Sequence, residues 1–306
     1  MSNSRKLRIA FAAIAVCASA RPASAQSEYR ERIDTAVTLE RGGTLSVAMY
    51  AGRVNVTGTS GSQVRIRGMV VDRNDLTIRA RASSVSLSME PGGHRGGRGA
   101  LDITVPIGTR VVLEGFSTPF SIRGVKGEAS VESMSGSVVV NDAVGNVSVE
   151  TVSGRIEVSG VAGDLNAESV SGRLTLTGID GDIVTESVSG AISITGAKSR
   201  TVSAESVQGS VTYDGTIDPS GNYSFATHAG ALTLAVPANA GATVTLETFS
   251  GTVDSDFPVT LESGSSRRDH ESKFEFRIGD GRSRIVLETF SGDIKIQRGT
   301  GRANQE

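Results

Sequence analysis

A glutamate recurs at nearly constant spacing through the middle of this 306-residue chain. The interval is 18 or 19 residues over most of the column, and most copies begin a motif of the form Glu-Ser/Thr-Val/Met/Phe-Ser-Gly. Carboxylates brought together by such a repeat could ligate a hard cation such as Ca²⁺ or supply the two acids that glycoside hydrolysis requires. The glutamates are Glu114, Glu132, Glu150, Glu168, Glu186, Glu205, Glu247 and Glu288.

Stacked carboxylates repel one another, so a cation or solvent must offset the repulsion. Arginines follow two of the glutamates by five residues, and we expect them to act as partners. The column is therefore interpreted as a solvated surface ladder rather than a catalytic site. We expect no cofactor. Calcium bridging between the glutamates is the alternative, although the glycine-rich nonapeptide pattern of calcium-binding repeats is absent. The predicted ladder comprises Glu132, Glu150, Glu168, Glu186, Arg155 and Arg173.

The other polar residues favour structural roles. His94, His228 and His270 have no metal-ligand spacing, and His228 falls in a repeat position where we expect it to pack at a corner. Asp164 and Asp182 follow glycines, where such residues usually bond to nearby backbone donors. The repeated serines are expected to form hydrogen bonds at corners, since no catalytic triad motif accompanies them. They are Ser135, Ser153, Ser171 and Ser189.

One column of the motif is apolar. Phe116, Phe249 and Phe290 align there with Met134 and Val152. At a corner, such a column either packs into the core or faces outward as a platform for a carbohydrate or protein partner.

The elements that position these columns are short strands. Two and four residues after the motif's glycine stand apolar residues, such as Ile156 and Val158, with a polar residue between them. This alternation is typical of a strand with one buried face. A second apolar strand follows in each central repeat, and glycines such as Gly160 and Gly178 mark the corner between the two.

A unit of 18 to 21 residues cannot bury its own apolar side, so it must stack on its neighbours. The sequence therefore predicts an all-β fold, a single-stranded parallel β-solenoid (β-helix) of 18–21-residue coils over residues 48–297. A propeller built from pairs of repeats is the alternative. Residues 26–47 are predicted to cap the rod and residues 298–306 to form a flexible tail. The 41 residues between Glu247 and Glu288 leave room for two coils, one of them degenerate, with a polar insertion at 262–271.

The first 25 residues have the three parts of a secretory signal peptide: a basic start, an apolar run over 9–20 and small residues at 23–25. The only cysteine, Cys17, lies inside this segment, so the mature chain would contain none. The signal holds 4 of the 31 cations and no acid, which leaves 27 cations against 33 acids, a net charge of −6. An acidic surface does not favour nucleic acid as a partner, and no later segment is apolar enough to form a transmembrane span.

The repeats, together with the closing Leu287-Glu-Thr-Phe-Ser-Gly-Asp-Ile-Lys-Ile296, resemble the bacterial putative-adhesin family of domains of unknown function, LiaG-like β-strand repeat proteins. The resemblance covers roughly residues 35–297 and implies a β-solenoid of the cell envelope without catalytic residues.

The leading hypothesis is a non-catalytic exported module, in the periplasm, on the cell surface or secreted, that binds an envelope protein or polysaccharide. The alternatives are a carbohydrate-active β-helix enzyme of the polysaccharide lyase or hydrolase kind, and a passive structural spacer.

Overall fold

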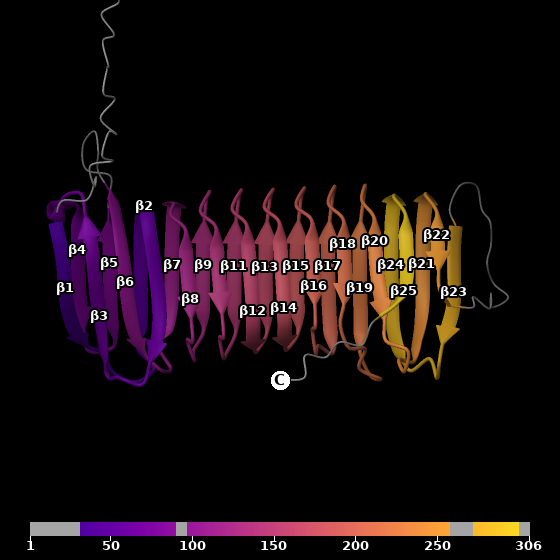
Figure 1. Cartoon of the computed structure of the whole chain (residues 1–306), viewed down its shortest axis with the longest axis horizontal. Helices are drawn as coiled ribbons and strands as arrows, with labels where there is room; N and C mark the ends of the chain where they lie inside the picture. The colour runs from indigo at the N-terminus through magenta and orange to yellow at the C-terminus, as the bar shows by residue number, and fades with distance from the viewer. Residues whose placement is uncertain (1–30, 90–96, 258–271, 300–306) are drawn as a thin grey trace, which may run out of the picture.

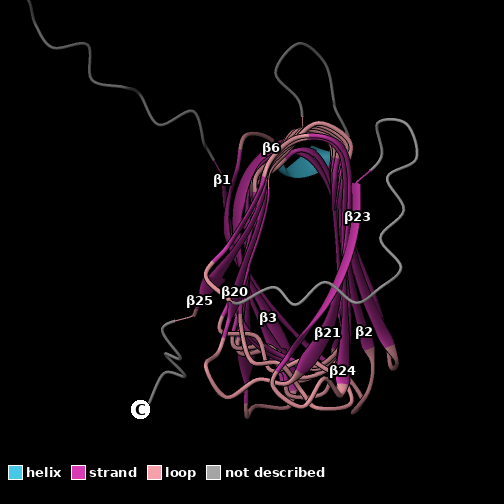
Figure 2. Cartoon of the chain, turned by 90° about the vertical axis from the view of Figure 1, so that its right-hand side faces the viewer, coloured by secondary structure: helices cyan, strands magenta, loops and turns pink. Residues whose placement is uncertain are grey.

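Two long β-sheets face one another along a rod. The structure, a computed structural model, describes residues 31–89, 97–257 and 272–299 (Figure 1). Each central coil gives one strand to each sheet, and successive coils pair in parallel. In cross-section the rod is a flattened ring with a narrow arch at one corner (Figure 2). This arch is the upper corner, formed by four-residue turns such as 152–155 between one sheet and the other.

Sheet 1 carries the glutamate column. In spatial order its strands are β4 (Leu76–Arg81), β5 (Ser84–Met89), the first half of β2 (Thr44–Thr59), β7 (Arg110–Ser117), β9 (Ala129–Ser133), β11 (Val147–Thr151), β13 (Leu165–Ser169), β15 (Ile183–Ser187), β17 (Thr201–Ser206), β19 (Asn222–Thr227), β24 (Ser283–Ser291), β21 (Ala242–Ser250) and β23 (Ser272–Ile278).

Sheet 2 covers the other side of the core. Its strands are β1 (Glu31–Thr38), β3 (Gln63–Val70), β6 (Arg98–Pro106), the second half of β2, β8 (Phe120–Arg123), β10 (Val138–Asn141), β12 (Ile156–Ala162), β14 (Leu174–Asp180), β16 (Ile192–Thr195), β18 (Val211–Asp214), β20 (Leu232–Val236), β25 (Ile294–Arg298) and β22 (Val253–Ser255). A short 3-10 helix, η1 (Arg73–Asp75), lies between β3 and β4. No helix of the described ranges is long and apolar enough to cross a membrane.

The parallel solenoid predicted from the repeats is confirmed. Ile156 pairs with Leu174, and Leu174 with Ile192, in neighbouring parallel strands. All three side chains are buried, as is the rest of the apolar column they belong to except Val253, which is partly buried. Because equivalent side chains lie one above another, a continuous apolar core runs along the rod.

Glycine is required at the two corners for two different reasons. At the lower corner Gly160 and Gly178 have φ of 64° and 63°, a conformation that disfavours a Cβ. At the upper corner the coils approach too closely for a side chain: a Cβ on Gly172 would lie 1.8 Å from the carbonyl oxygen of Gly154. Gly190 stands in the same relation to Gly172. These contacts fix the coil spacing at the arch.

At both ends the coils do not stack in chain order. The first half of β2 lies between β5 and β7, and β24 lies between β19 and β21. Glu247 and Glu288 are therefore direct neighbours. The expectation of two coils between them is wrong, because β23 runs antiparallel along the outside of β21 instead of forming a coil in the same direction.

Antiparallel strands close both ends of the rod. At the N-terminal end β1 and β3 pair antiparallel in sheet 2, and β4 pairs antiparallel with β5 in sheet 1. Of the region predicted as the cap, residues 31–38 form the outermost strand of sheet 2, whereas residues 44–47 begin β2 within the solenoid. The predicted signal peptide, the polar insertion at 262–271 and most of the predicted tail lie outside the described residues.

Candidate functional site

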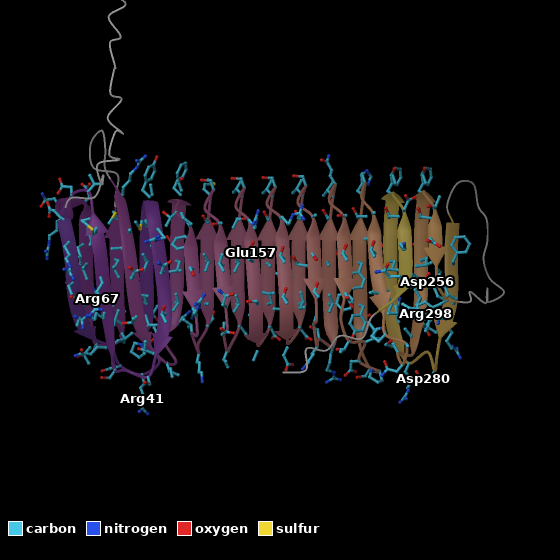
Figure 3. All side chains as sticks on the ribbon, in the orientation of Figure 1. Arg41, Arg67, Glu157, Asp256, Asp280 and Arg298 are labelled. Atoms are coloured by element: carbon cyan, nitrogen blue, oxygen red, sulfur yellow. The ribbon has the colours of Figure 1, made fainter. Side chains whose placement is uncertain are left out.

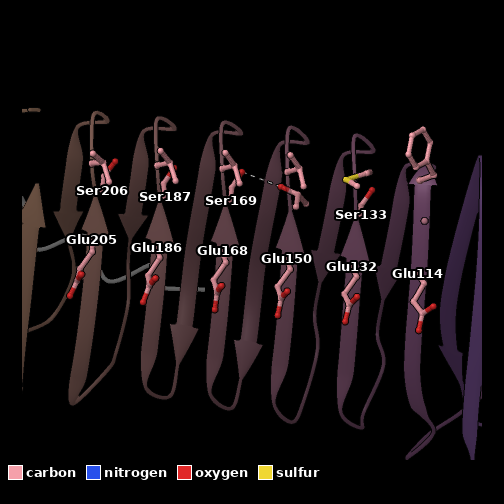
Figure 4. A pocket seen from close by; sticks show the side chains of 18 of the residues that line it. Glu114, Glu132, Ser133, Glu150, Glu168, Ser169, Glu186, Ser187, Glu205 and Ser206 are labelled. Atoms are coloured by element: carbon pink, nitrogen blue, oxygen red, sulfur yellow. Dashed lines mark hydrogen bonds between the residues drawn. The ribbon is translucent and has the colours of Figure 1, made fainter. Parts of the chain in front are cut away.

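Six glutamates form an unbroken row on the outer face of sheet 1 (Figure 4). Each pairs with the equivalent glutamate of the next coil. The row is Glu114, Glu132, Glu150, Glu168, Glu186 and Glu205. It is bounded by alanines, because Ala48 pairs with Glu114 and Ala226 with Glu205. Parallel strands lie about 4.8 Å apart, so the row spans about 24 Å.

The charges of this row are not neutralised by cations among the described residues. Within that part of the chain, no ion pair reaches any of the six carboxylates. Glu168 accepts a hydrogen bond from Asn166 Nδ2 at 2.9 Å. Burial raises the pKa of the Glu150 carboxyl, and the charges of Glu168 and Glu132 raise it further.

The two arginines of the predicted ladder lie around the upper corner from the glutamates. Arg155 directly precedes β12 in sheet 2 and donates to Glu157 at 3.1 Å, so it is not the partner of Glu150. Arg173 holds the same position one coil further on, before β14. The sequence spacing of five residues placed them near the row, but the turn between carries them to the other sheet.

Side chains project outward from the upper corner all along the rod (Figure 3). A mostly apolar row runs along this corner beside the glutamates. Its nine apolar members are between 42% and 49% exposed, so this column faces outward and does not pack in the core. The corner row comprises Tyr50, Phe116, Met134, Val152, Val170, Val188, Val207, His228, Phe290 and Phe249, of which all but His228 are apolar.

Both ends of the corner row are aromatic and its centre is aliphatic. The Tyr50 and Phe116 rings stack with centroids 5.1 Å apart. At the other end Phe290 stacks on both His228 and Phe249, at 4.8 Å each. His228 is thus an exposed member of the row rather than a packed corner residue.

Hydrogen bonds between coils hold the corner row in place. Ser171 Oγ donates to the Val152 carbonyl at 3.2 Å, as predicted for this serine column, and Ser153 and Ser189 make the equivalent bond. Ser169, buried beneath the row, accepts from Gly172 N at 2.8 Å. The corner therefore presents its apolar side chains at a fixed spacing.

The two aspartates accept backbone hydrogen bonds, but from the next coil rather than from their own turn as predicted. Asp164 Oδ1 accepts from the backbone N–H of Asp182, and Asp182 Oδ1 accepts from that of Thr201. Both carboxylates thus tie one coil to the next at the lower end of sheet 1.

An open groove of about 980 Å³ runs between the glutamate row and the corner row. The six glutamates line one side and corner residues from Tyr50 to His228 the other, with buried serines and threonines between them. Among the described residues that line the groove there is neither lysine nor arginine. No cluster of three or more metal-ligating side chains occurs in the described ranges. The groove thus presents carboxylates along one side and mostly apolar side chains along the other.

Replacement of Glu150 by glutamine is expected to stabilise the protein at neutral pH. Its raised pKa means that the carboxyl favours folding only while protonated: this contribution is present below the unfolded-chain pKa and is lost as pH rises through the folded-state pKa. After allowance for solvent screening, we expect Glu150→Gln to gain about 0.5 kcal/mol at pH 7 and little at pH 4.

Thermal unfolding of both proteins at pH 4 and pH 7 checks this expectation. The control is Glu157→Gln, which loses its contact with Arg155 and gains nothing at pH 7. High salt should reduce the difference in stability between Glu150→Gln and the unchanged protein at pH 7, because salt screens repulsion between exposed charges. An equal gain at both pH values would contradict the electrostatic explanation.

The solved structures that match this chain are remote in sequence. A lipid-binding protein (so described only putatively) from Parabacteroides distasonis has 9% identity and a TM-score of 0.47, over 86% of this chain and 96% of that one. A putative adhesin from Bacteroides fragilis has 12% identity and a TM-score of 0.42, over 88% and 98%. No curated protein matches. The family model described as Toastrack DUF4097 matches residues 32–297, almost the whole described solenoid, and the chain therefore belongs to this family of β-strand repeat proteins.

Proposed function

We propose that this protein is a non-catalytic, exported surface module that holds an elongated partner along the groove of its upper corner. The observation that carries the proposal is the corner row itself, in which nine apolar side chains and His228 are exposed in one continuous line. Single exposed apolar residues are ordinary, but a contiguous apolar patch on a monomer usually marks an interaction site.

The glutamate row supports the same function. Six adjacent carboxylates repel one another, and the pKa of Glu150 is raised as a result of burial and of its neighbours. An arrangement that costs stability is expected where the charges serve a ligand rather than the fold. The two rows run side by side along the groove, so one partner can contact both.

The regularity of the groove favours binding over catalysis. The three coils that carry Val152, Val170 and Val188 each present a glutamate, a serine or threonine, and a valine in the same register. Glycoside hydrolysis would need one acid and one base with different environments, whereas a repeated surface distributes binding energy along its length.

Replacement of the central corner row by serine is expected to abolish most of the binding. The triple variant Val152→Ser, Val170→Ser and Val188→Ser removes exposed apolar area without changing the core. The matched control is Val144→Ser with Val184→Ser, two valines of similar exposure outside the groove. Mature protein and variants would be immobilised and exposed to fractionated envelope proteins and polysaccharides, and the retained material quantified.

We expect the protein and the control variant to retain the same envelope material. The triple variant should retain at least tenfold less of it. Equal retention by the triple variant would overturn the proposal. If a retained polysaccharide were cleaved, and Glu150→Gln with Glu168→Gln abolished the cleavage, the carbohydrate-active alternative would replace it.

A further inference from the structure

We infer that the occupant of the groove is an extended, cationic polypeptide in the polyproline II conformation, with a basic residue at every third position. This inference rests on the proposed function and names the chemistry of the partner. It follows from the charge, the apolar surface and the repeat length of the groove.

The sign of the charge selects the partner class. The described lining residues include six glutamates and neither lysine nor arginine. An acidic polysaccharide or an anionic lipid surface would be repelled, and so would a second copy of the chain placed row against row. Lysine or arginine side chains would relieve the repulsion between neighbouring glutamates and gain a charge-assisted contact in return.

The corner row adds a second requirement. A ligand that reaches Glu150 and Glu168 also lies against Val152 and Val170, because both pairs line one groove. Cations must therefore occupy one edge of the ligand and apolar side chains an adjacent edge. A polypeptide satisfies this requirement with side chains of different kinds, whereas a uniform polymer of amines satisfies only half of it.

The coil spacing selects the conformation. A polyproline II helix advances about 9.3 Å per turn of three residues, close to two coils at about 9.6 Å. Lysines at every third position would thus meet every second glutamate and drift by less than about 1 Å over the whole row. The turn of an α-helix, about 5.4 Å, is longer than the coil spacing by about 0.6 Å. Side chains one turn apart on such a helix would therefore move out of register with the glutamates within the length of the row.

Two further features of the groove fit this conformation. The groove crosses the strands of sheet 1, whose backbone groups already pair with neighbouring strands, so a ligand must bind through side chains. Polyproline II has no internal hydrogen bonds and keeps its backbone in water, which an open groove allows. Aromatic pairs such as Tyr50 and Phe116 flank the groove, and aromatic-lined grooves are the surfaces on which proline-rich segments dock.

The test uses synthetic 18-residue peptides and the mature protein. The in-register peptide is (Lys-Pro-Val)₆, the first comparison peptide has the same composition in shuffled order, and the second replaces lysine by glutamate. A lysine-rich amphipathic helix of equal charge is the third. Isothermal titration calorimetry at about 50 mM and 200 mM salt measures the dissociation constants, a range over which charge contacts weaken.

We expect the in-register peptide to bind at least tenfold more tightly than the shuffled and helical peptides, and the glutamate peptide not to bind. The triple variant Glu150→Gln, Glu168→Gln and Glu186→Gln should weaken binding at least tenfold. Glu31→Gln, Glu40→Gln and Glu157→Gln together change the net charge equally but lie outside the groove, and should leave affinity unchanged.

Equal binding of the shuffled or helical peptide would overturn the register argument, and tighter binding of the glutamate peptide would overturn the charge argument. If no lysine peptide binds while the serine variant of the corner row still loses its envelope ligand, this inference fails and the proposed function stands. If the serine variant loses nothing, the proposed function itself fails.

Discussion

Replacement of Gly172 by valine is expected to lower the free energy of unfolding by about 3 kcal/mol or more, at the upper end of the effects of overpacking. A Cβ at this position would lie 1.8 Å from the Gly154 carbonyl oxygen and 2.8 Å from Ser169 Oγ. Neither neighbour can withdraw, because the Gly154 carbonyl is backbone and Ser169 Oγ is held by Gly172 N. The coils must therefore separate at the arch.

Urea unfolding followed by circular dichroism measures this loss. Gly61→Val is the matched control, since a Cβ there would meet only Thr59 Oγ1, at 3.5 Å. We expect the control to unfold at nearly the wild-type midpoint. If Gly172→Val matched the control, close packing at the upper corner would not be what sets the coil spacing.

Removal of one whole coil is expected to leave a folded, shorter rod, whereas removal of half a coil is expected to abolish folding. Deletion of residues 173–190 joins Gly172 to Ala191, so that β12 meets β16 and β13 meets β17 in the register they already use with their neighbours. Deletion of residues 173–181 moves every later strand to the opposite sheet. It also removes the close approach of Gly190 to the Gly172 backbone at the upper corner.

Circular dichroism and size-exclusion chromatography of the two deletions decide the matter. The whole-coil deletion should keep a cooperative unfolding transition. Its free energy of unfolding should depend less steeply on denaturant concentration, because less surface is exposed on unfolding. A folded half-coil deletion, or an unfolded whole-coil deletion, would be incompatible with equivalent, stacked coils.

The architecture could be predicted from sequence because the repeat itself encodes register. Fixed spacing places Ile156, Leu174 and Ile192 in one column, and alternation shows that the column is buried on one face. Physically, a unit too small to enclose a core has stacking as its only means of burying apolar area. The same logic located the glutamate row and the hydrogen bonds of the corner serines.

The direction of the corner column could not be decided from its residue types. Valine and phenylalanine suit a core as well as a platform, and a turn interrupts the alternation that would tell them apart. The useful signal lies one residue earlier: Thr151 and Ser169 alternate with Glu150 and Glu168 and point inward, which leaves Val152 and Val170 on the outside. The same turn explains why Arg155 lies beside Glu157 and not beside Glu150.

The stacking order of the end coils could not be predicted from the spacing of the motifs. A gap of 41 residues is compatible with two coils in one direction or with a reversal, since both use similar lengths of chain. The structure has the reversal, in which β23 returns along β21 before β24 enters the sheet.

This reversal has a consequence for how the chain is completed during synthesis. The places beside β19 and β20 belong to β24 and β25, whereas β21 and β22 are made before them and lie further out. A growing chain cannot therefore add its final coils one after another from the centre outward. Strands β21 and β22 reach their places beside β24 and β25 only after residues 283–298 have been synthesised.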